Sequence, residues 1–210
     1  MDFCKQKIRI LFLTLVNKTT DKNAIWQIDM NYLLWYNHFC KFGFVSKDSA
    51  GDKLMIVLKQ AQNKDRELLW NLLQKYLYEM TKYYSDEMEA DGNYAYRYFD
   101  AYFTEPERKA YFICDGETPV GFAMINPYSY FHHPSDNVIA EFTIFPAYRG
   151  KHIALQAAQK LIDAHPGQWE IKFHESNTGA KKLWETVTAP YHPNVYHLGD
   201  DETVLEFNNS

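Results

Sequence analysis

The period of the hydrophobic pattern changes along this chain and divides it into two parts. From residue 55 onward, short apolar runs alternate with stretches in which apolar residues recur every three or four positions. The short runs predict strands at residues 55–59, 110–114, 120–125, 138–145, 169–173, 195–198 and 203–207. The other stretches predict helices at residues 65–84, 94–103, 150–164 and 178–187.

The order of these elements predicts the fold class. Short turns at residues 115–118 and around Gly199-Asp200 predict two antiparallel hairpins. The helix at 150–164 joins two strands as a β-α-β crossover, which makes those two strands parallel. We therefore expect an α/β protein of the α+β type, in which a mixed, largely antiparallel sheet is flanked by helices.

Residues 1–54 have mixed polarity and little periodicity, and they end in a turn-rich stretch. We expect an N-terminal extension of unknown role over residues 1–54 and a regular domain over residues 55–210. The apolar run Ile8–Val16 is too short to cross a membrane, so we expect a buried strand there. The extension is too apolar to remain in water, so it could cover part of the sheet or mediate self-association as a homodimer.

The net charge of −5 is unevenly distributed. Residues 1–54 hold 8 basic and 5 acidic side chains, a net +3, whereas the remainder holds 14 and 22, a net −8. Because a nucleic-acid surface needs a basic face, no nucleic-acid partner is expected. The acidic body favours a cationic substrate, and plain solubility explains it equally well.

The cysteines and histidines bear on redox and metal chemistry. The three cysteines are scattered and form no C-x-x-C pair, a usage typical of a reducing cytoplasm. The eight histidines show no metal-ligand spacing, so no metal is expected. The adjacent His132 and His133 cannot both reach one ion from a regular element, and we interpret them as loop residues.

The segment with the most specific chemistry follows the strand at 138–145. That strand breaks at Pro146, and a short basic turn, Arg149-Gly150-Lys151, leads directly into the next helix. The first N–H groups of a helix have no partner within the helix, and the helix dipole adds positive potential there. This arrangement predicts a phosphate site, and the alternative is a basic helix start without a ligand.

Two motifs in this region resemble the Gcn5-related N-acetyltransferase (GNAT) superfamily, which uses acetyl-CoA. Residues 149–154 read R-G-K-H-I-A and are similar to the family pattern Arg/Gln-x-x-Gly-x-Gly/Ala. Arg149 matches the first position and Ala154 the last, whereas His152 stands where the family usually has glycine. The second match is Asn177-x-x-Ala180 with Leu183-Trp184. The resemblance covers about residues 55–207 and implies a GNAT-like sheet.

The resemblance implies that acetyl-CoA is the cosubstrate. In the family, backbone N–H groups of the turn hold the CoA pyrophosphate. The cofactor-binding residues that the resemblance implies are Thr143, Ile144, Arg149, Gly150, Lys151, His152, Ile153, Ala154 and Asn177. The ring of His152 could point to solvent or lie beside a phosphate. Asn177 could hydrogen-bond the cofactor arm, cap a helix, or do both.

Glu141 is the candidate general base. It is the one charge in the apolar strand 138–144, where a carboxylate is costly unless it is partnered or faces a cleft. Strand alternation places Glu141, Ile139 and Thr143 on one face. Glu141 also matches an acidic position of many family members, and a salt-bridged structural glutamate is the alternative.

The general acid is less defined by the sequence. The family often places a tyrosine after Asn-x-x-Ala, but here Trp184 follows, whose indole N–H is a donor and not an acid. Tyr191, Tyr196 or water could take this role.

The expected function is therefore transfer of an acetyl group from acetyl-CoA to an amine of a small molecule or peptide. Acidic and aromatic side chains near the early helices suit an amine acceptor through charge and cation–π contacts. They are Glu79, Asp86, Glu87, Glu89, Asp91, Tyr76, Tyr78, Tyr83, Tyr84, Tyr94 and Tyr96. A solvated acidic loop over packed tyrosines is the alternative. The alternative is a catalytically silent GNAT-like module that binds CoA or acts in interactions. A doubly wound nucleotide-binding protein is disfavoured, because G-x-G-x-x-G is absent and the early strands form hairpins.

Overall fold

The computed structural model describes residues 55–210, and the predictions for residues 1–54, including the strand at Ile8–Val16, lie outside this range. The strands are β1 (Ile56–Gln60), β2 (Lys109–Asp115), β3 (Thr118–Asn126), β4 (Asn137–Ile144), β5 (Gln168–His174), β6 (Asn194–His197) and β7 (Glu202–Asn208). The helices are α3 (Arg66–Met80), α4 (Ala101–Thr104), α5 (Ile153–Asp163) and α6 (Thr178–Thr188). Short 3-10 turns lie at Asn63–Asp65, Pro146–Tyr148 and Ala189–Tyr191.

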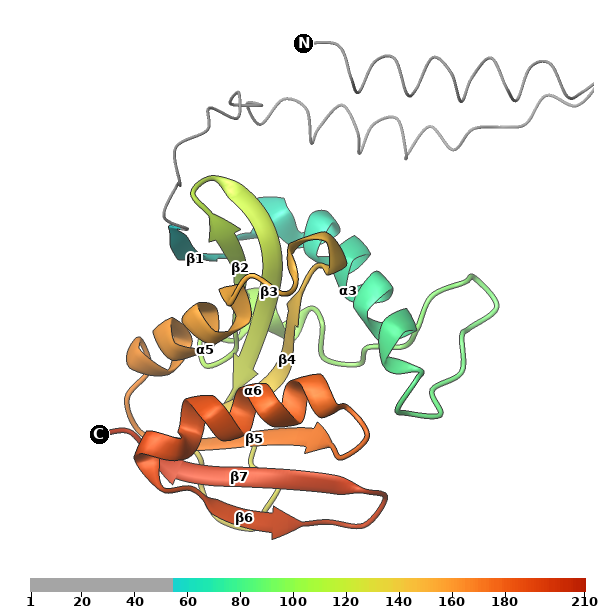
Figure 1. Cartoon of the computed structure of the whole chain (residues 1–210). Helices are drawn as coiled ribbons and strands as arrows, with labels where there is room; N and C mark the ends of the chain where they lie inside the picture. The colour runs from blue at the N-terminus through green and yellow to red at the C-terminus, as the bar shows by residue number, and fades with distance from the viewer. Residues whose placement is uncertain (1–54) are drawn as a thin grey trace, which may run out of the picture. The chain divides into compact units, whose positions relative to one another are not determined.

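The strands form one mixed sheet in the order β1-β2-β3-β4-β5-β7-β6 (Figure 1). Every neighbouring pair is antiparallel except β4 and β5, which are parallel and joined through α5. Both predicted hairpins and the predicted crossover are therefore confirmed, and so is the fold class.

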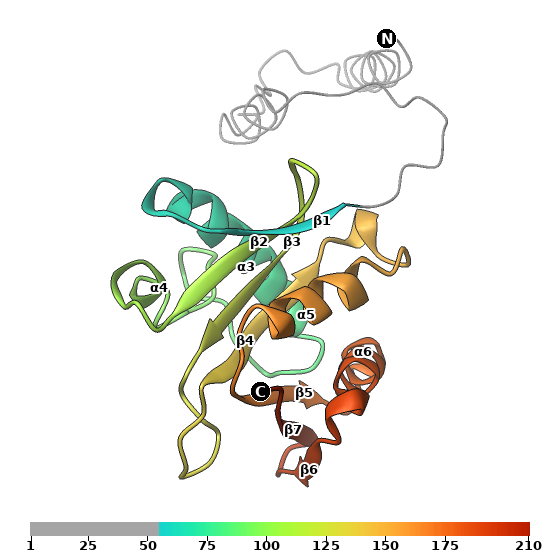
Figure 2. The same ribbon diagram turned by 90° about the vertical axis from the view of Figure 1, so that its left-hand side faces the viewer.

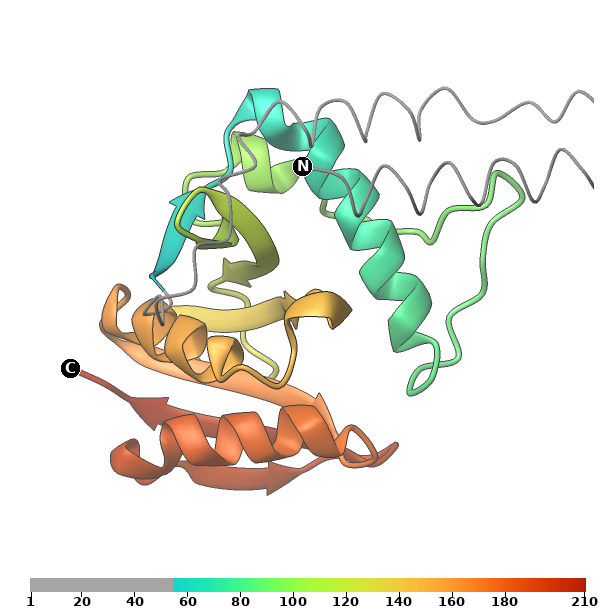
Figure 3. The ribbon, with the colours of Figure 1, turned by 45° about the horizontal axis from the view of Figure 1, so that its top comes forward.

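Helices cover both faces of the sheet (Figure 2). Leu69 and Leu73 of α3 are fully buried against Phe112 and Phe122 of one face. Helices α5 and α6 lie side by side on the opposite face, where they pack on a second core cluster (Figure 3). Each fully buried leucine contributes about 1.5–3 kcal/mol, so the apolar stripe of α3 holds it firmly on the sheet.

The helix predicted for residues 94–103 is largely wrong, because only Ala101–Thr104 is helical. The side chain of Gln74 binds the backbone of Tyr94 on both sides: its Nε2 donates to the carbonyl at 3.1 Å, and its Oε1 accepts from the N–H at 2.6 Å. Tyr94 is therefore held beside α3 in a segment without regular secondary structure. The aromatic spacing that predicted a helix reflects packing of separate turns on the sheet.

Strands β4 and β5 separate where the candidate site begins. They pair only over Asn137–Ile139 and Trp169–Ile171, although both strands continue further (Figure 1). At the same level β4 has a bulge: Ile139 lies opposite Ile125 and Glu141 lies opposite Met124, so Ala140 is an extra residue. The edge of β4 that faces β5 is therefore open beyond Ile139.

The bulge corrects the predicted side-chain alternation. In a regular strand, residues two positions apart point to the same face of the sheet. When the residue between them is an extra one, as in a bulge, they point to opposite faces. Ile139 packs in the core under α5 and α6, whereas Glu141 faces α3. Thr143 lies opposite Phe122, which belongs to the α3 core, so Thr143 shares the face of Glu141 as predicted.

Candidate active site

Glu141 lies at a pocket between β4, α3 and the segment that follows α3. The phenol groups of Tyr76 and Tyr96 lie close enough to its carboxyl group to act on its pKa as hydrogen-bond donors. The pocket has a volume of about 270 Å3. Its lining residues are Leu77, Asp86, Glu87, Tyr94, Ala95, Tyr96 and Glu141.

Burial raises the pKa of Glu141 to about 7, from an ordinary value of 4.5. The hydrogen bonds from Tyr76 and Tyr96 and the charge of Lys172 oppose this rise in pKa but do not cancel it. Within residues 55–210, no lysine, arginine or histidine forms an ion pair with this carboxylate. The structure therefore does not support a salt-bridged structural role, and a carboxyl group that titrates near neutral pH is well placed to act as a base.

Four tyrosines surround Glu141 and keep their protons at neutral pH. Desolvation is the main cause in each case: it raises the pKa of Tyr84 to about 12, and it also raises the pKa values of Tyr76, Tyr96 and Tyr130. The nearby negative charge of Glu141 adds to every one of these rises in pKa. The sequence marked the first three only as acceptor-side aromatics, and Tyr130 carried no sequence signal.

The structure does not bring Tyr191 to Glu141. Its ring stacks on Phe207 with centroids 5.1 Å apart, and its hydroxyl accepts a hydrogen bond from Gln159 Nε2 at 2.9 Å. These contacts place Tyr191 with α5 and α6, on the opposite face of the sheet.

Tyr196 is engaged in a separate polar cluster. Its hydroxyl donates to Glu206 Oε2 at 3.0 Å, and this hydrogen bond raises the pKa of Tyr196. The other oxygen of Glu206 lies 3.2 Å from Nε2 of His133, which belongs to a loop as predicted. The neighbouring carboxylate of Glu170 accepts from Ser129 Oγ at 2.5 Å and from the Tyr130 N–H at 2.7 Å.

This cluster ties the loop between β3 and β4 to the sheet. His133, Glu170 and Glu206 bring atoms of metal-ligating types within 4.8 Å of one another, a convergence that the sequence did not reveal. Loop and strand donors bind both carboxylates, so these contacts hold in place the loop that carries Tyr130.

The turn after β4 has the geometry of an anion site. Gly150 has φ of 78° and His152 has φ of 57°, so both adopt the left-handed conformation. After Arg149, the next backbone N–H that donates a hydrogen bond belongs to Gln156, and it donates to the carbonyl of His152 at 3.3 Å. Among the described residues, none accepts a hydrogen bond from the N–H groups of residues 150–155. Such a run of unpaired amides at a helix start binds phosphate well.

The side chains of the turn divide into two kinds. Arg149 is partly exposed but paired with protein groups, since its Nη atoms contact Glu79 and its Nε donates to the carbonyl of Ile144 at 2.7 Å. Lys151 and His152 are exposed, and the ammonium of Lys151 lies 5.7 Å from the ring centre of Tyr148. The exposed His152 ring fits the solvent-facing alternative.

The remaining candidate residues lie around the opening between β4 and β5. Thr143 and Ile144 belong to the part of β4 that no longer pairs with β5. Ile153 is buried, and only its backbone faces the turn, whereas the next residue, Ala154, is half-buried. Asn177 caps α6, because its Oδ1 accepts from the N–H of Ala180 at 3.1 Å.

Trp184 proves to be a core residue. It is buried and packs edge-on against Phe142, with ring centroids 5.0 Å apart. Its side chain therefore anchors α6 and takes no part in proton transfer.

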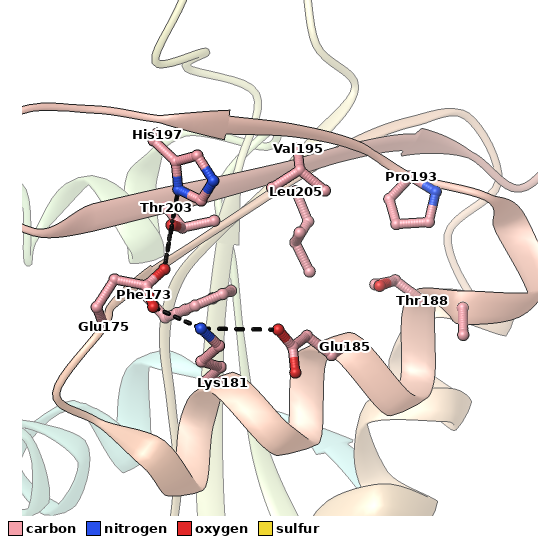
Figure 4. A pocket seen from close by; sticks show the side chains of 11 residues that line it. Phe173, Glu175, Lys181, Glu185, Thr188, Pro193, Val195, His197, Thr203 and Leu205 are labelled. Atoms are coloured by element: carbon pink, nitrogen blue, oxygen red, sulfur yellow. Dashed lines mark hydrogen bonds and ion pairs between the residues drawn. The ribbon is translucent and has the colours of Figure 1, made fainter.

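A second pocket of about 270 Å3 lies between α6 and the hairpin of β6 and β7 (Figure 4). Its polar groups bind one another: Lys181 lies 2.6 Å from Glu175 and 4.0 Å from Glu185, and Thr203 donates to Glu175. The hydrogen bond from Lys181 lowers the pKa of Glu175. Because its acidic group is paired and its pKa is lowered, this pocket offers no base comparable to Glu141.

Comparisons with known proteins agree with the geometry. A family model described as the acetyltransferase (GNAT) family matches residues 69–187, which is more than half of the chain. The fold is similar to an acetyltransferase from Thermus thermophilus, with 17% identity, a TM-score of 0.54, and coverage of 74% of this chain and 97% of that chain. It is also similar to a GNAT acetyltransferase from Streptococcus agalactiae, with 14% identity, a TM-score of 0.55, and coverage of 74% of this chain and 96% of that chain.

A third similar structure contains ligands. It is the aminoglycoside acetyltransferase AAC(6')-Ib in complex with coenzyme A and kanamycin, with 10% identity, a TM-score of 0.55, and coverage of 74% of this chain and 95% of that chain. At these identities the solved structures share the fold alone. A comparison with curated protein sequences finds no match. In the described residues, no helix is both long and apolar enough to span a membrane.

Proposed function

This chain belongs to the acetyltransferase (GNAT) family, and from that premise we propose that it transfers the acetyl group of acetyl-CoA to an amine of a small molecule or peptide. The observation that carries the proposal is the Glu141 carboxyl group. It lines a pocket beside the open edge of β4, and its pKa is raised to about 7.

The turn after β4 fits the pyrophosphate of CoA. Six successive N–H groups, residues 150–155, are free to donate, and Lys151 adds an exposed positive charge. Thr143 and Ile144 line the open edge of β4, where they could bind the arm of the cofactor through the backbone. Acetyl-CoA supplies the acetyl group as an activated thioester.

The Glu141 pocket fits a cationic acceptor. Asp86 and Glu87 join Glu141 in its lining, so an alkylammonium group is attracted, and Tyr94 and Tyr96 add aromatic faces. An amine reacts only through its free lone pair, so Glu141 removes a proton from the bound ammonium group. Tyr76 and Tyr96 hold the carboxylate in place during this step.

Water is the proposed proton source for the departing sulfur. Tyr191 lies on the opposite face of the sheet, and Tyr196 is bound to Glu206. Of the three sources that the sequence left open, water is the one that needs no side chain to give up its present contacts.

A thiol-release assay tests the proposal. Acetyl-CoA is incubated with the full chain and with kanamycin, spermidine or a peptide with a free N-terminus, and mass spectrometry detects the acetylated product. We expect at least one amine to be acetylated and Glu141→Gln to lower kcat/KM by about 10²–10⁴-fold. CoA binding without transfer to any amine would instead favour the catalytically silent module.

A further inference from the structure

Arg149 and Glu79 form the most complete ion pair at the candidate site. Nη1 of Arg149 lies 2.6 Å from Oε1 of Glu79, and Nη2 lies 2.7 Å from Oε2, so the contact is bidentate. The Nε of the same guanidinium donates to the carbonyl of Ile144, the last residue of β4. Arg149 therefore connects α3 to the end of β4 through three hydrogen bonds.

This pair joins the two halves of the proposed site. Arg149 begins the phosphate turn, and Glu79 lies on the last turn of α3. Three residues earlier on the same helix, Tyr76 binds the Glu141 carboxyl group. Residues three apart lie on one helix face, so a shift of α3 at Glu79 also moves Tyr76.

We propose that Glu79 and Arg149 are a positioning pair that holds the phosphate turn and the Glu141 pocket in register, and that Arg149 is not a ligand of the cofactor phosphates. The inference rests on the proposed function, because it assumes that CoA occupies the turn. It differs from the expectation for Arg149 as a cofactor-binding side chain.

The charges at the turn support this assignment. The positive charge of Arg149 is already balanced by Glu79, so it adds little attraction for a phosphate. Lys151 and the free N–H groups of residues 150–155 remain to bind the anion. Three of the five N–H donors of Arg149 are engaged by Ile144 and Glu79. A phosphate that bound the two remaining donors would lie close to the Glu79 carboxylate, whose negative charge repels it.

Two variants separate a positioning role from a phosphate ligand by the sign of their effect. If Arg149 were a phosphate ligand, Glu79→Gln would free it and tighten CoA binding, whereas Arg149→Gln would weaken binding strongly. If the pair positions the turn, both variants loosen the turn and both weaken CoA binding. The side chains of Arg149 and Glu79 are 43% and 27% exposed, so each variant should lose only about threefold to tenfold in CoA affinity.

Calorimetric titration of the full chain with CoA is the test. We expect the double variant Glu79→Gln/Arg149→Gln to bind no more weakly than Arg149→Gln alone, because the ion pair is lost in both, and Arg149→Gln also loses the hydrogen bond to Ile144. Arg149→Lys keeps the charge but not the bidentate geometry, and it should restore only part of the affinity. Lys82→Gln is the matched control: Lys82 contacts the same Glu79 oxygen at 3.4 Å but does not reach the turn, and CoA affinity should remain unchanged.

A kinetic readout separates positioning from general loss of structure. With an amine that the chain acetylates, both single variants should lower kcat as well as CoA affinity, because Tyr76 on α3 shifts relative to Glu141 on β4. Circular dichroism confirms that the variants fold. Tighter CoA binding by Glu79→Gln, or additive losses in the double variant, would overturn the inference while leaving the proposed function intact. A wild-type chain that does not bind CoA would overturn both.

Discussion

The raised pKa of Glu141 has a measurable effect on stability. The carboxyl group titrates at about 7 in the folded chain and near 4.5 when unperturbed. Between these pH values the folded state holds more protons than the unfolded state, so stability falls as pH rises. The penalty is absent below pH 4.5 and complete above pH 7. Glu141→Gln removes the charge and should therefore stabilise the folded chain at alkaline pH.

The size of this effect on the free energy of unfolding follows from the shift in the pKa of Glu141. A rise of 2.5 pKa units corresponds to roughly 3 kcal/mol, and partial exposure of the carboxyl group reduces it to about 1–3 kcal/mol. Urea unfolding followed by tryptophan fluorescence at pH 5, 6, 7 and 8 measures the difference in unfolding free energy between Glu141→Gln and wild type. We expect a small difference at pH 5 that grows to the full value at pH 8.

The control is Glu107→Gln, which removes an exposed carboxylate that forms no ion pair among the described residues. Its effect should be small at every pH. A Glu141→Gln effect that is independent of pH, or a variant that is less stable than wild type at pH 8, would refute the burial argument.

Three further predictions concern the phosphate turn and the extension. Gly150→Pro cannot adopt φ of 78° and removes an N–H, so calorimetry should show CoA affinity falling by about 100-fold or more; unchanged affinity would place the phosphate site elsewhere. His152 is exposed and has a left-handed backbone that glycine adopts easily, so His152→Gly should change CoA affinity by less than about threefold. A loss of CoA affinity that is larger at low pH than at high pH would show that the ring contacts phosphate. The fragment 55–210 should fold cooperatively and bind CoA, because the seven described strands lie within it; loss of its thermal transition would make residues 1–54 part of the core.

Much of the fold was predictable because each strand has a strong local signal. Apolar runs bounded by turn residues located all seven strands, and the single helix between β4 and β5 made that pair parallel. A lone carboxylate in an apolar strand also drew attention to Glu141, which lines a pocket in the structure, and its role as a base stays a prediction. The helix predicted at 94–103 was largely wrong because the Gln74 side chain, 20 residues earlier, binds both backbone groups of Tyr94 and holds it outside a helix.

The rest of the site depends on contacts that local sequence does not encode. The bulge at Ala140 is set by pairing with β3, and it decides that Ile139 and Glu141 face opposite sides. The Glu79–Arg149 pair joins residues 70 positions apart. His152 stands where the family usually has glycine. The backbone of His152 is left-handed, a conformation that glycine adopts most easily, and the sequence alone does not reveal it.

The central claim is that Glu141 takes the proton from an amine whose acetyl donor is acetyl-CoA. The most direct test is the pH dependence of kcat/KM for the best amine of the panel, measured with isotope-labelled acetyl-CoA and mass spectrometry. We predict that wild-type kcat/KM rises with pH through an apparent pKa near 7 and that Glu141→Gln loses this dependence together with about 10²–10⁴-fold in rate. A Glu141→Gln variant with the wild-type rate and pH profile would contradict the account.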